Sequence, residues 1–226
     1  MSGLSGSASG DAPKRTAVLI SGRGSNMAAL VKAAEREDFP AEIALVLSNR
    51  ADAAGLEFAK EHRIPTLVLN HKHYADRLAF DAALDAHLKA EGIEIVCLAG
   101  FMRLLTPWLV ERWRNRMINV HPSLLPSFKG LHTHERALEA GVRVHGCTVH
   151  FVRAEMDEGP IILQAVVPIE ADDTPDVLAD RVLEQEHIIY PKGLELLASG
   201  RLTVAEERVL IEGVRGGLKP LVLPVV

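Results

Sequence analysis

The sequence has few of the residues that would place this chain in several large classes of protein. Only two of its 226 residues are cysteines, which excludes the disulfide framework of small secreted domains. No apolar run approaches the roughly 20 residues that span a bilayer, and the N-terminus has no basic segment followed by an apolar one. We therefore expect a cytoplasmic protein with no membrane partner.

Charge of one sign is not in excess either. The chain has 25 basic and 30 acidic residues, and a net charge of -5 provides no positive field for nucleic acid. We expect no nucleic-acid partner, so any phosphate must be bound at a local site. The two cysteines, Cys97 and Cys147, lie in apolar runs and are expected to be free thiols in the core.

Hydrophobic residues, by contrast, are abundant, at 48% of the chain, and suffice for one buried domain. Residues 1–13 are small and polar and are expected to be a disordered leader, followed by a single domain over 14–226. From Thr16 short apolar runs alternate with amphipathic ones, which is the pattern of a parallel sheet with helices on both faces. The expected strands are 17–21, 42–48, 66–70 and 93–100, and the expected helices are about 26–36, 53–62 and 75–90.

The second half of the chain is less regular. Two β-rich runs, 146–152 and 161–169, indicate a long hairpin in a mixed sheet. Helices are expected at about 107–112, 134–140 and 175–197, with one last strand and a tail after Leu202. We predict an α/β fold with a Rossmann-like half over about 16–114, which binds a phosphate, and a half over about 115–212, which completes a ligand cleft.

The stretch 118–130, INVHPSLLPSFKG, combines polar side chains with the end of a strand. Alternate side chains of a strand leave the same face, so Asn119 and His121 should point the same way, roughly 6–7 Å apart. Pro122 and Pro126 end the strand, and the carboxyl ends of strands are where open α/β sheets bind ligands. A carboxamide and an imidazole at this position favour a reactive site over packing alone.

A second candidate site is the glycine-rich turn SGRGSN at 21–26, between the first strand and the first helix. Glycine allows an anion to approach the backbone, and the first amides of the helix can bind it. A dinucleotide is disfavoured because Met27 replaces the third glycine of G-x-G-x-x-G and no acidic residue follows the second strand. A single phosphate fits better, and an ordinary turn with Ser25 as helix cap is the alternative.

Two motifs, NVHPSLLP at 119–126 and DEGPII at 157–162, resemble the signature of enzymes that transfer a formyl group from 10-formyltetrahydrofolate. ISGRGSN at 20–26 and QEHIIYP at 185–191 further resemble the glycinamide ribonucleotide formyltransferases of purine biosynthesis, and the similarity covers about 17–208. The resemblance implies a Rossmann-like formyltransferase fold. It also implies transfer of the formyl group from 10-formyltetrahydrofolate, a cosubstrate, to the amine of glycinamide ribonucleotide, which leaves formylglycinamide ribonucleotide and tetrahydrofolate.

The resemblance implies three catalytic residues. Asn119 as a donor and protonated His121 would stabilise the oxyanion of a tetrahedral intermediate. The resemblance selects Asp157, which otherwise reads as part of a solvated acidic loop, to keep His121 charged and to help move a proton through water. The substrate amine is already a nucleophile, so we expect direct attack without a covalent enzyme intermediate.

The resemblance also implies binding roles. For the ribonucleotide, Gly24, Ser25 and Asn26 would hold the phosphate and Glu186 the ribose hydroxyls, although Leu183 replaces a polar contact of some relatives. For the folate, the pterin would meet the backbone of Met102, Arg103, Leu104 and Leu105, with Asn119 beside it. Arg77 would meet the glutamate carboxylate, although on its own it reads as a surface helix charge.

We expect no metal, because the spacings of four histidines in the second half match no zinc motif and no cysteine pair accompanies them. These histidines are His132, His134, His145 and His150. A monomer or weak homodimer is expected.

Three other functions compete. A formyltetrahydrofolate hydrolase would use the same Asn, His and Asp with water as acceptor, but would need no phosphate loop and usually carries an N-terminal regulatory domain. A methionyl-tRNA formyltransferase shares HPSLLP, but its relatives carry a C-terminal RNA-binding domain, for which we expect no room after the last helix. A nucleotide-binding module without catalysis is the third alternative, and failure to form a ternary complex with a folate analogue and the ribonucleotide would support it.

Overall fold

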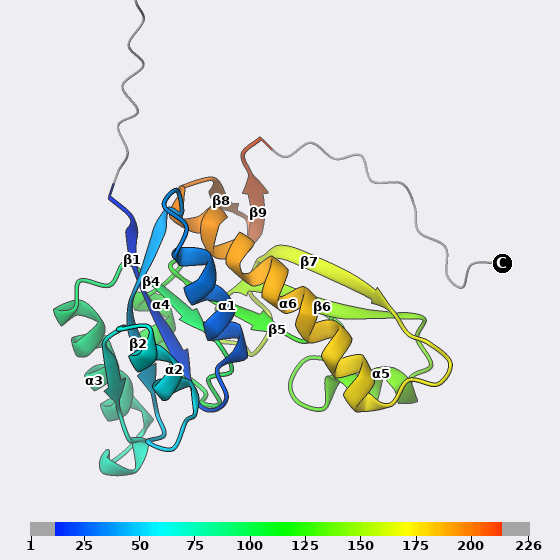
Figure 1. Cartoon of the computed structure of the whole chain (residues 1–226), viewed down its shortest axis with the longest axis horizontal. Helices are drawn as coiled ribbons and strands as arrows, with labels where there is room; N and C mark the ends of the chain where they lie inside the picture. Colours follow the sequence, from blue (N-terminus) through cyan, green and yellow to red (C-terminus); the bar gives the residue numbers. More distant parts are fainter. Residues whose placement is uncertain (1–11, 214–226) are drawn as a thin grey trace, which may run out of the picture.

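The computed structural model describes residues 12–213, so residues 1–11 of the expected leader and the chain after residue 213 lie outside the described part (Figure 1). One seven-stranded sheet has the order β3-β2-β1-β4-β5-β6-β7. The first five strands are mutually parallel, whereas β6 is antiparallel to both β5 and β7. The strands are β1 (Lys14–Ile20), β2 (Ala41–Ser48), β3 (Thr66–Val68), β4 (Ile95–Leu98), β5 (Met117–His121), β6 (Val144–Phe151) and β7 (Ile161–Pro168). The predicted α/β fold with a mixed second half is confirmed.

Helices cover both faces of this sheet (Figure 1). One face packs against α1 (Ser25–Ala34), α2 (Gly55–Glu61) and α6 (Pro175–Ala198). The other packs against α3 (Arg77–Ala90) and α4 (Pro107–Arg112), and a short 3-10 helix, η1 (His71–His73), precedes α3. Near β6 and β7, α5 (Thr133–Glu139) contacts α6. No helix in residues 12–213 has the length and apolarity that crossing a membrane requires.

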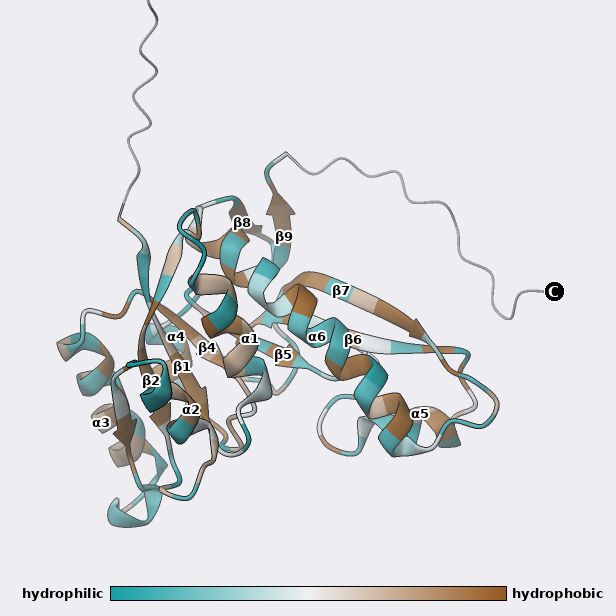
Figure 2. Ribbon diagram, viewed as in Figure 1, coloured by the Kyte–Doolittle hydropathy of each residue, from teal (hydrophilic) through white to brown (hydrophobic). Residues whose placement is uncertain are grey.

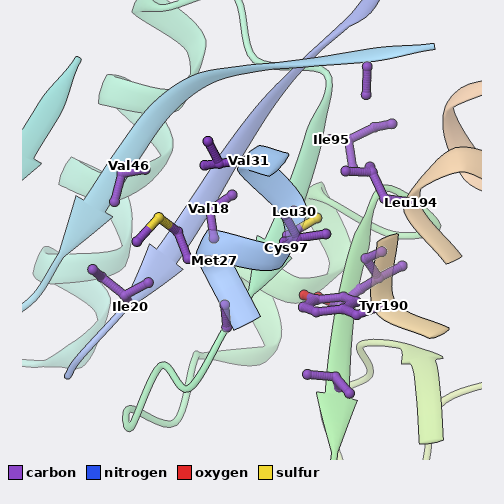
Figure 3. Packing of buried hydrophobic residues seen from close by; sticks show 14 of the residues in the cluster. Val18, Ile20, Met27, Leu30, Val31, Val46, Ile95, Cys97, Tyr190 and Leu194 are labelled. Carbon is purple, nitrogen blue, oxygen red and sulfur yellow. The ribbon is translucent and has the colours of Figure 1, made fainter. Parts of the chain in front are cut away.

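Alternation along the central strands explains why both faces are covered. In β1, Val18 and Ile20 belong to the core under α1 and α6, whereas Ala17 and Leu19 belong to the core under α3 and α4. Figure 2 shows β1 as hydrophobic beyond its first residues, and Figure 3 shows Val18 and Ile20 with Met27 of α1. The part of β1 that contributes to both cores, residues 17–20, is therefore apolar throughout.

The starts of two helices follow from their sequences. Thr106 precedes Pro107 at the start of α4, and its hydroxyl accepts a hydrogen bond from Leu109 N. Thr174 and Pro175 repeat the arrangement at the start of α6. Both helices thus have a side chain that satisfies one of the free amides of the first turn.

Helix α6 lies close against the sheet. Gly193 has no room for a side chain, because a Cβ there would lie 2.8 Å from Cγ1 of Val149 on β6. Nearby, the hydroxyl of Tyr190 lies 2.9 Å from the carbonyl oxygen of Leu98 and 3.2 Å from that of Ile118. The hydroxyl of one α6 side chain therefore lies within hydrogen-bond distance of two neighbouring strands, β4 and β5.

The chain after α6 differs from the prediction of a single strand and a tail. Residues 202–211 form an antiparallel hairpin, β8 (Leu202–Ala205) and β9 (Arg208–Ile211). Its turn residues, Glu206 and Glu207, have φ values of 49° and 55°. The prediction was wrong because this backbone conformation is usual for Asn and Gly, so a Glu-Glu pair carries no turn signal.

Both cysteines are buried. Cys97 on β4 and Cys147 on β6 are unpaired and fully excluded from solvent, as expected. Burial raises the pKa of each thiol to about 12.

Candidate active site

The site begins where three parallel strands end. The chain runs from β1 outward to β2 and β3, then returns to place β4 on the other side of β1, and such reversals open a crevice at the carboxyl ends of the strands. Ser21, directly after β1, accepts a hydrogen bond from Met102 N at 2.9 Å and donates one to Oδ1 of Asn49 at 2.6 Å. The loops that follow β1, β2 and β4 are thereby joined.

Asn119 and His121 stand at the carboxyl end of β5. Their neighbours Ile118 and Val120 point into the α6 side of the core, so the polar pair points to the opposite face. There both residues line a cavity of about 480 Å³. The other expected site residues that line it are Met102, Arg103, Leu104, Leu105 and Asp157.

The two nitrogens of His121 have different partners. Nε2 lies 3.1 Å from the carbonyl oxygen of Phe128, so it carries a proton and donates it. Nδ1 is then the atom that can gain and lose a proton, and it lies 3.5 Å from Oδ2 of Asp157. Both side chains are less than a tenth exposed. Asp157 and His121 therefore form a close pair that is largely shielded from solvent.

Asp157 is not a solvated loop carboxylate. Its Oδ2 accepts a hydrogen bond of 2.9 Å from Gly130 N, and its backbone has φ 58°. The neighbouring Glu155 and Glu158 are exposed, as an acidic surface loop predicts. Local hydrogen bonding and an unusual backbone conformation therefore turn one of three clustered acids inward.

His150 is a site residue that the sequence did not predict. It pairs with Asn119 across the antiparallel β5–β6 ladder, so the two side chains share one face. Its Nδ1 donates to the carbonyl oxygen of Phe151 at 2.9 Å, which leaves Nε2 to accept from Nδ2 of Asn119 at 3.2 Å. Burial lowers the pKa of His150 to about 4, so the ring is neutral and fixes the orientation of the Asn119 amide. Only the register of β5 and β6, which pairs His150 with Asn119, could have revealed the role of His150.

The loop after β5 is held from β6 and β7. The hydroxyl of Thr148 donates to the carbonyl oxygen of Ser123 at 2.7 Å and accepts from Leu125 N at 3.1 Å. Gln164 of β7 donates to the carbonyl oxygen of Leu125 at 2.9 Å. These bonds fix the path of the chain from His121 to Phe128, and with it the acceptor of Nε2.

Two further histidines lie near this loop. The rings of His134 and His145 meet edge to face at 5.3 Å, and burial lowers both pKa values, that of His145 to about 4. Over residues 12–213, no three His, Cys, Asp or Glu side chains are grouped as a metal site.

The glycine turn meets the start of α1. Gly24, with φ 77°, occupies the N-cap position, and no side chain bonds to the first amides of the helix. Ser25 is the first helical residue, so the alternative in which it caps α1 is wrong. A Cβ on Gly24 would lie 3.0 Å from the Cα of Gly55, at the start of α2. This helix start, unlike those of α4 and α6, has its amides left over for an anion.

Asn26 and Glu186 meet although 160 residues separate them. Nδ2 of Asn26 donates to a carboxylate oxygen of Glu186 at 2.6 Å, linking α1 to α6. Burial raises the pKa of Glu186 to about 7. Leu183, one turn earlier in α6, is half-buried.

The expected folate residues divide into two groups. The loop 102–105 lines the cavity with the exposed side chains of Met102 and Leu104, and Met102 N is already used by Ser21. Arg77, the first residue of α3, is exposed and does not line the cavity. The guanidinium of Arg103 stacks on Phe80 at 4.4 Å.

Comparisons with known proteins agree on one family. The model of a family described as formyl transferase matches residues 14–194. Phosphoribosylglycinamide formyltransferase of Haemophilus influenzae is 42% identical over 200 residues, which are 88% of this chain and 94% of that protein. The human trifunctional purine biosynthetic protein adenosine-3 is 52% identical over 192 residues, 85% of this chain but 19% of that protein. The chain thus spans 14% to 19% of the length of the trifunctional relatives.

Solved structures give the same picture. Glycinamide ribonucleotide transformylase 1 from Symbiobacterium toebii is 47% identical with a TM-score of 0.87, covering 90% of this chain and 99% of that one. A formyltetrahydrofolate deformylase from Pseudomonas syringae has a TM-score of 0.83 at 26% identity, covering 89% of this chain and 67% of that one.

Proposed function

Because the chain belongs to the formyl transferase family, we propose that it is an enzyme that transfers the formyl group of 10-formyltetrahydrofolate to the amine of glycinamide ribonucleotide. The products are formylglycinamide ribonucleotide and tetrahydrofolate, in purine biosynthesis. The names of the bacterial relatives, which the chain matches over nearly their whole length, support this substrate pair.

The observation that carries the proposal is the grouping of Asn119, His121 and Asp157 on one wall of a cavity of about 480 Å³. A carboxamide donor, an imidazole and a carboxylate are the groups that acyl transfer to an amine requires. The volume lies within the usual range for a small-molecule site. The apolar side chains of Met102 and Leu104, which line the same cavity, suit a flat ring system.

In the proposed reaction the amine attacks the formyl carbon directly. The Asn119 amide, held by neutral His150, donates to the developing oxyanion, and Nδ1 of His121 carries the positive charge that stabilises it. Asp157 holds the proton on His121 and receives the proton that the attacking amine loses, through water. That proton passes to the folate nitrogen as the carbon–nitrogen bond breaks, so the enzyme ends in its starting state.

The ribonucleotide is proposed to bind between α1 and α6. The uncapped amides after Gly24, with Ser25 and Asn26, take the phosphate, and Glu186 accepts from the ribose hydroxyls. The folate is proposed to bind along residues 102–105 and beside Asn119, with its glutamate toward Arg77 at the start of α3. We propose that the enzyme is a cytoplasmic monomer or weak homodimer and that it acts on both substrates without metal or nucleic acid.

The test is formyl transfer by the purified chain with both substrates. We expect release of tetrahydrofolate that depends on glycinamide ribonucleotide and yields the formylated ribonucleotide in equal amount. The measurement is the absorbance change of the folate combined with mass spectrometry of the nucleotide. Release of tetrahydrofolate at the same rate without the ribonucleotide would overturn the proposal.

A hydrolase is the second candidate, favoured by the similarity to the deformylase structure. In that case water replaces the amine, and formate appears in place of formylated nucleotide. The uncapped amides of α1 and the Asn26–Glu186 pair support the transferase, because a hydrolase has no phosphate or ribose to bind. Formate and formylated nucleotide are measured in the same assay.

A further inference from the structure

The side chain of Arg153 lies where three turns of the chain meet. Its Nε donates to Glu207 Oε2 at 2.6 Å, its Nη2 to Oδ1 of Asn115 at 2.8 Å, and its Nη1 to the carbonyl oxygen of Val152 at 3.0 Å. Only 8% of the side chain is exposed. A guanidinium with each of its three nitrogens engaged in a fixed direction is a rigid connector rather than a solvated surface charge.

The turns that meet at Arg153 share one backbone property. Asn115, Glu206 and Glu207 have positive φ although none is glycine, and so does Asp157 in the loop that Arg153 begins. Such conformations persist where surrounding contacts specify them. Glu207 is held at this angle while its carboxylate bonds to both Arg153 and Arg114.

Arg153 also borders the reaction cavity. It lines the same space as Asn119, His121 and Asp157, and it stands four residues before Asp157. The loop 152–160 leaves and returns at one point, where Phe151 N donates to the carbonyl oxygen of Pro160 at 2.9 Å. At that point Gly159 lies so close that a Cβ would meet the carbonyl oxygen of Phe151 at 1.7 Å.

The far side of the loop has its own contacts. Asp157 accepts from Gly130 N, and Glu158 pairs with Lys129 at 2.7 Å. The loop is therefore held at its tip by residues 129–130 and at its base by Arg153. Because the 3.5 Å separation of Asp157 Oδ2 and His121 Nδ1 depends on where the tip lies, the base contacts bear on the proposed proton transfer.

We propose that Arg153 and Glu207 are positioning residues for the reaction: the β8–β9 hairpin, through Glu207, fixes the base of loop 152–160 and so holds Asp157 against His121. This rests on the proposed function of Asp157. The hairpin, which Figure 1 shows beyond the end of α6, thereby takes part in catalysis without touching a substrate.

The kinetic test compares Glu207→Ala with Glu111→Ala. Glu111 is a matched control because it pairs with the same Arg114, at 3.1 Å, but has no contact with Arg153. We expect Glu207→Ala to lower kcat by about ten- to a hundredfold with KM for the ribonucleotide unchanged, and Glu207→Gln, which still offers an acceptor oxygen, to recover part of it. Glu111→Ala should have wild-type kcat. Equal kinetics for both alanine variants would overturn the proposal.

A double-mutant comparison separates positioning from general damage. If Glu207 acts through Asp157, Glu207→Ala should cause no further loss of kcat in an Asp157→Asn background, whereas independent effects would multiply and contradict the proposal. Hydrogen exchange provides a readout that needs no activity. Amides of residues 153–158 should exchange faster in Glu207→Ala than in Glu111→Ala, and unchanged exchange would overturn the hairpin's role even if the enzyme has a different substrate.

Discussion

Burial and hydrogen-bond partners distinguish the histidines of the site from one another. Besides His121, three imidazoles lie in this region. Burial lowers the pKa of His134, and it lowers the pKa of His145 and His150 to about 4, so the last two are neutral. His121 differs because Nε2 donates to a carbonyl oxygen while Nδ1 faces the Asp157 carboxylate. Chemical identity alone does not distinguish these residues, whereas their contacts do.

Asp157→Asn tests this difference. The amide keeps the shape and can still accept from Gly130 N, but it removes the negative charge 3.5 Å from Nδ1 of His121. We expect turnover to fall by about 10²–10³. If turnover falls only because less His121 is charged, it should recover at lower pH. If it falls because Asp157 no longer transfers a proton, it should stay low at every pH. We expect mainly the second result. Turnover within a few-fold of wild type in the pH–rate profile would contradict the assignment.

Glu186→Gln tests the buried carboxyl beside Asn26. Burial raises the pKa of Glu186 from 4.5 to about 7, so between these values the folded protein keeps a proton that the unfolded chain has lost. The contribution of the neutral Glu186 carboxyl to the free energy of unfolding is complete below pH 4.5 and is lost as the pH rises to 7. Glutamine stays neutral, so the variant should exceed wild type at pH 8 by on the order of 3 kcal/mol in unfolding free energy.

The measurement is urea denaturation at several pH values between 4.5 and 8. Wild type and variant should be closest at the acidic end and diverge toward pH 7. Parallel stability curves would show that Glu186 ionises in the folded protein as it does in the unfolded chain.

At the scale of elements, α6 was predicted from helical spacing over 175–197, and it extends over Pro175–Ala198. The sequence also predicted the alternation of strands and helices in the first half, because the buried parts of its strands are apolar runs. The sequence did not reveal what α6 contacts, since Asn26 and Leu98 are distant in the chain. His150 was missed for the same reason: its role depends on the β5–β6 register, which hydrophobic pattern does not specify.

Tyr190→Phe tests the attachment of α6 to the sheet. The change removes a fully buried hydroxyl that lies within hydrogen-bond distance of the carbonyl oxygens of Leu98 and Ile118. We expect the free energy of unfolding in urea to fall by about 1–3 kcal/mol, because buried acceptors lose their donor. Tyr74→Phe is the control, since Tyr74 contacts Phe80 through its ring alone. Equal stability of the two variants would show that the hydroxyl of Tyr190 contributes nothing.

At the scale of the whole molecule, the two candidate sites rest on different parts of the sheet. The proposed phosphate turn follows β1 and contacts α6, whereas the proposed catalytic residues line a cavity beside β4, β5 and the loop after β6. Motifs indicated where both candidate sites lie, because a strand end followed by glycine or proline is visible in sequence, and the binding and catalytic roles stay predictions. The Arg153–Glu207 pair escaped prediction because it joins a charge in a loop to a turn with no turn residues.

This division predicts separable kinetic effects. Gly24→Val places a β-branched side chain at φ 77° beside Gly55, so KM for the ribonucleotide should rise about tenfold or more while KM for the folate changes little. His121→Ala should instead lower kcat by about 10²–10³ and leave ribonucleotide affinity nearly intact. Steady-state kinetics and titration calorimetry measure both. Equal increases in the two KM values of Gly24→Val would indicate misfolding rather than a damaged phosphate site.

Because the two thiols are completely buried, their reaction rates report how often the surrounding structure opens. A thiol reagent can reach Cys97 or Cys147 only when the surrounding layer separates, and a pKa of about 12 keeps each thiol unreactive until then. Cys97 lies in the large core under α1 and α6, whereas Cys147 lies in a four-residue cluster with Val182. We expect Cys147 to be alkylated first under native conditions, as followed by mass spectrometry of quenched samples. Identical rates would mean that the two halves of the sheet open only as one cooperative unit.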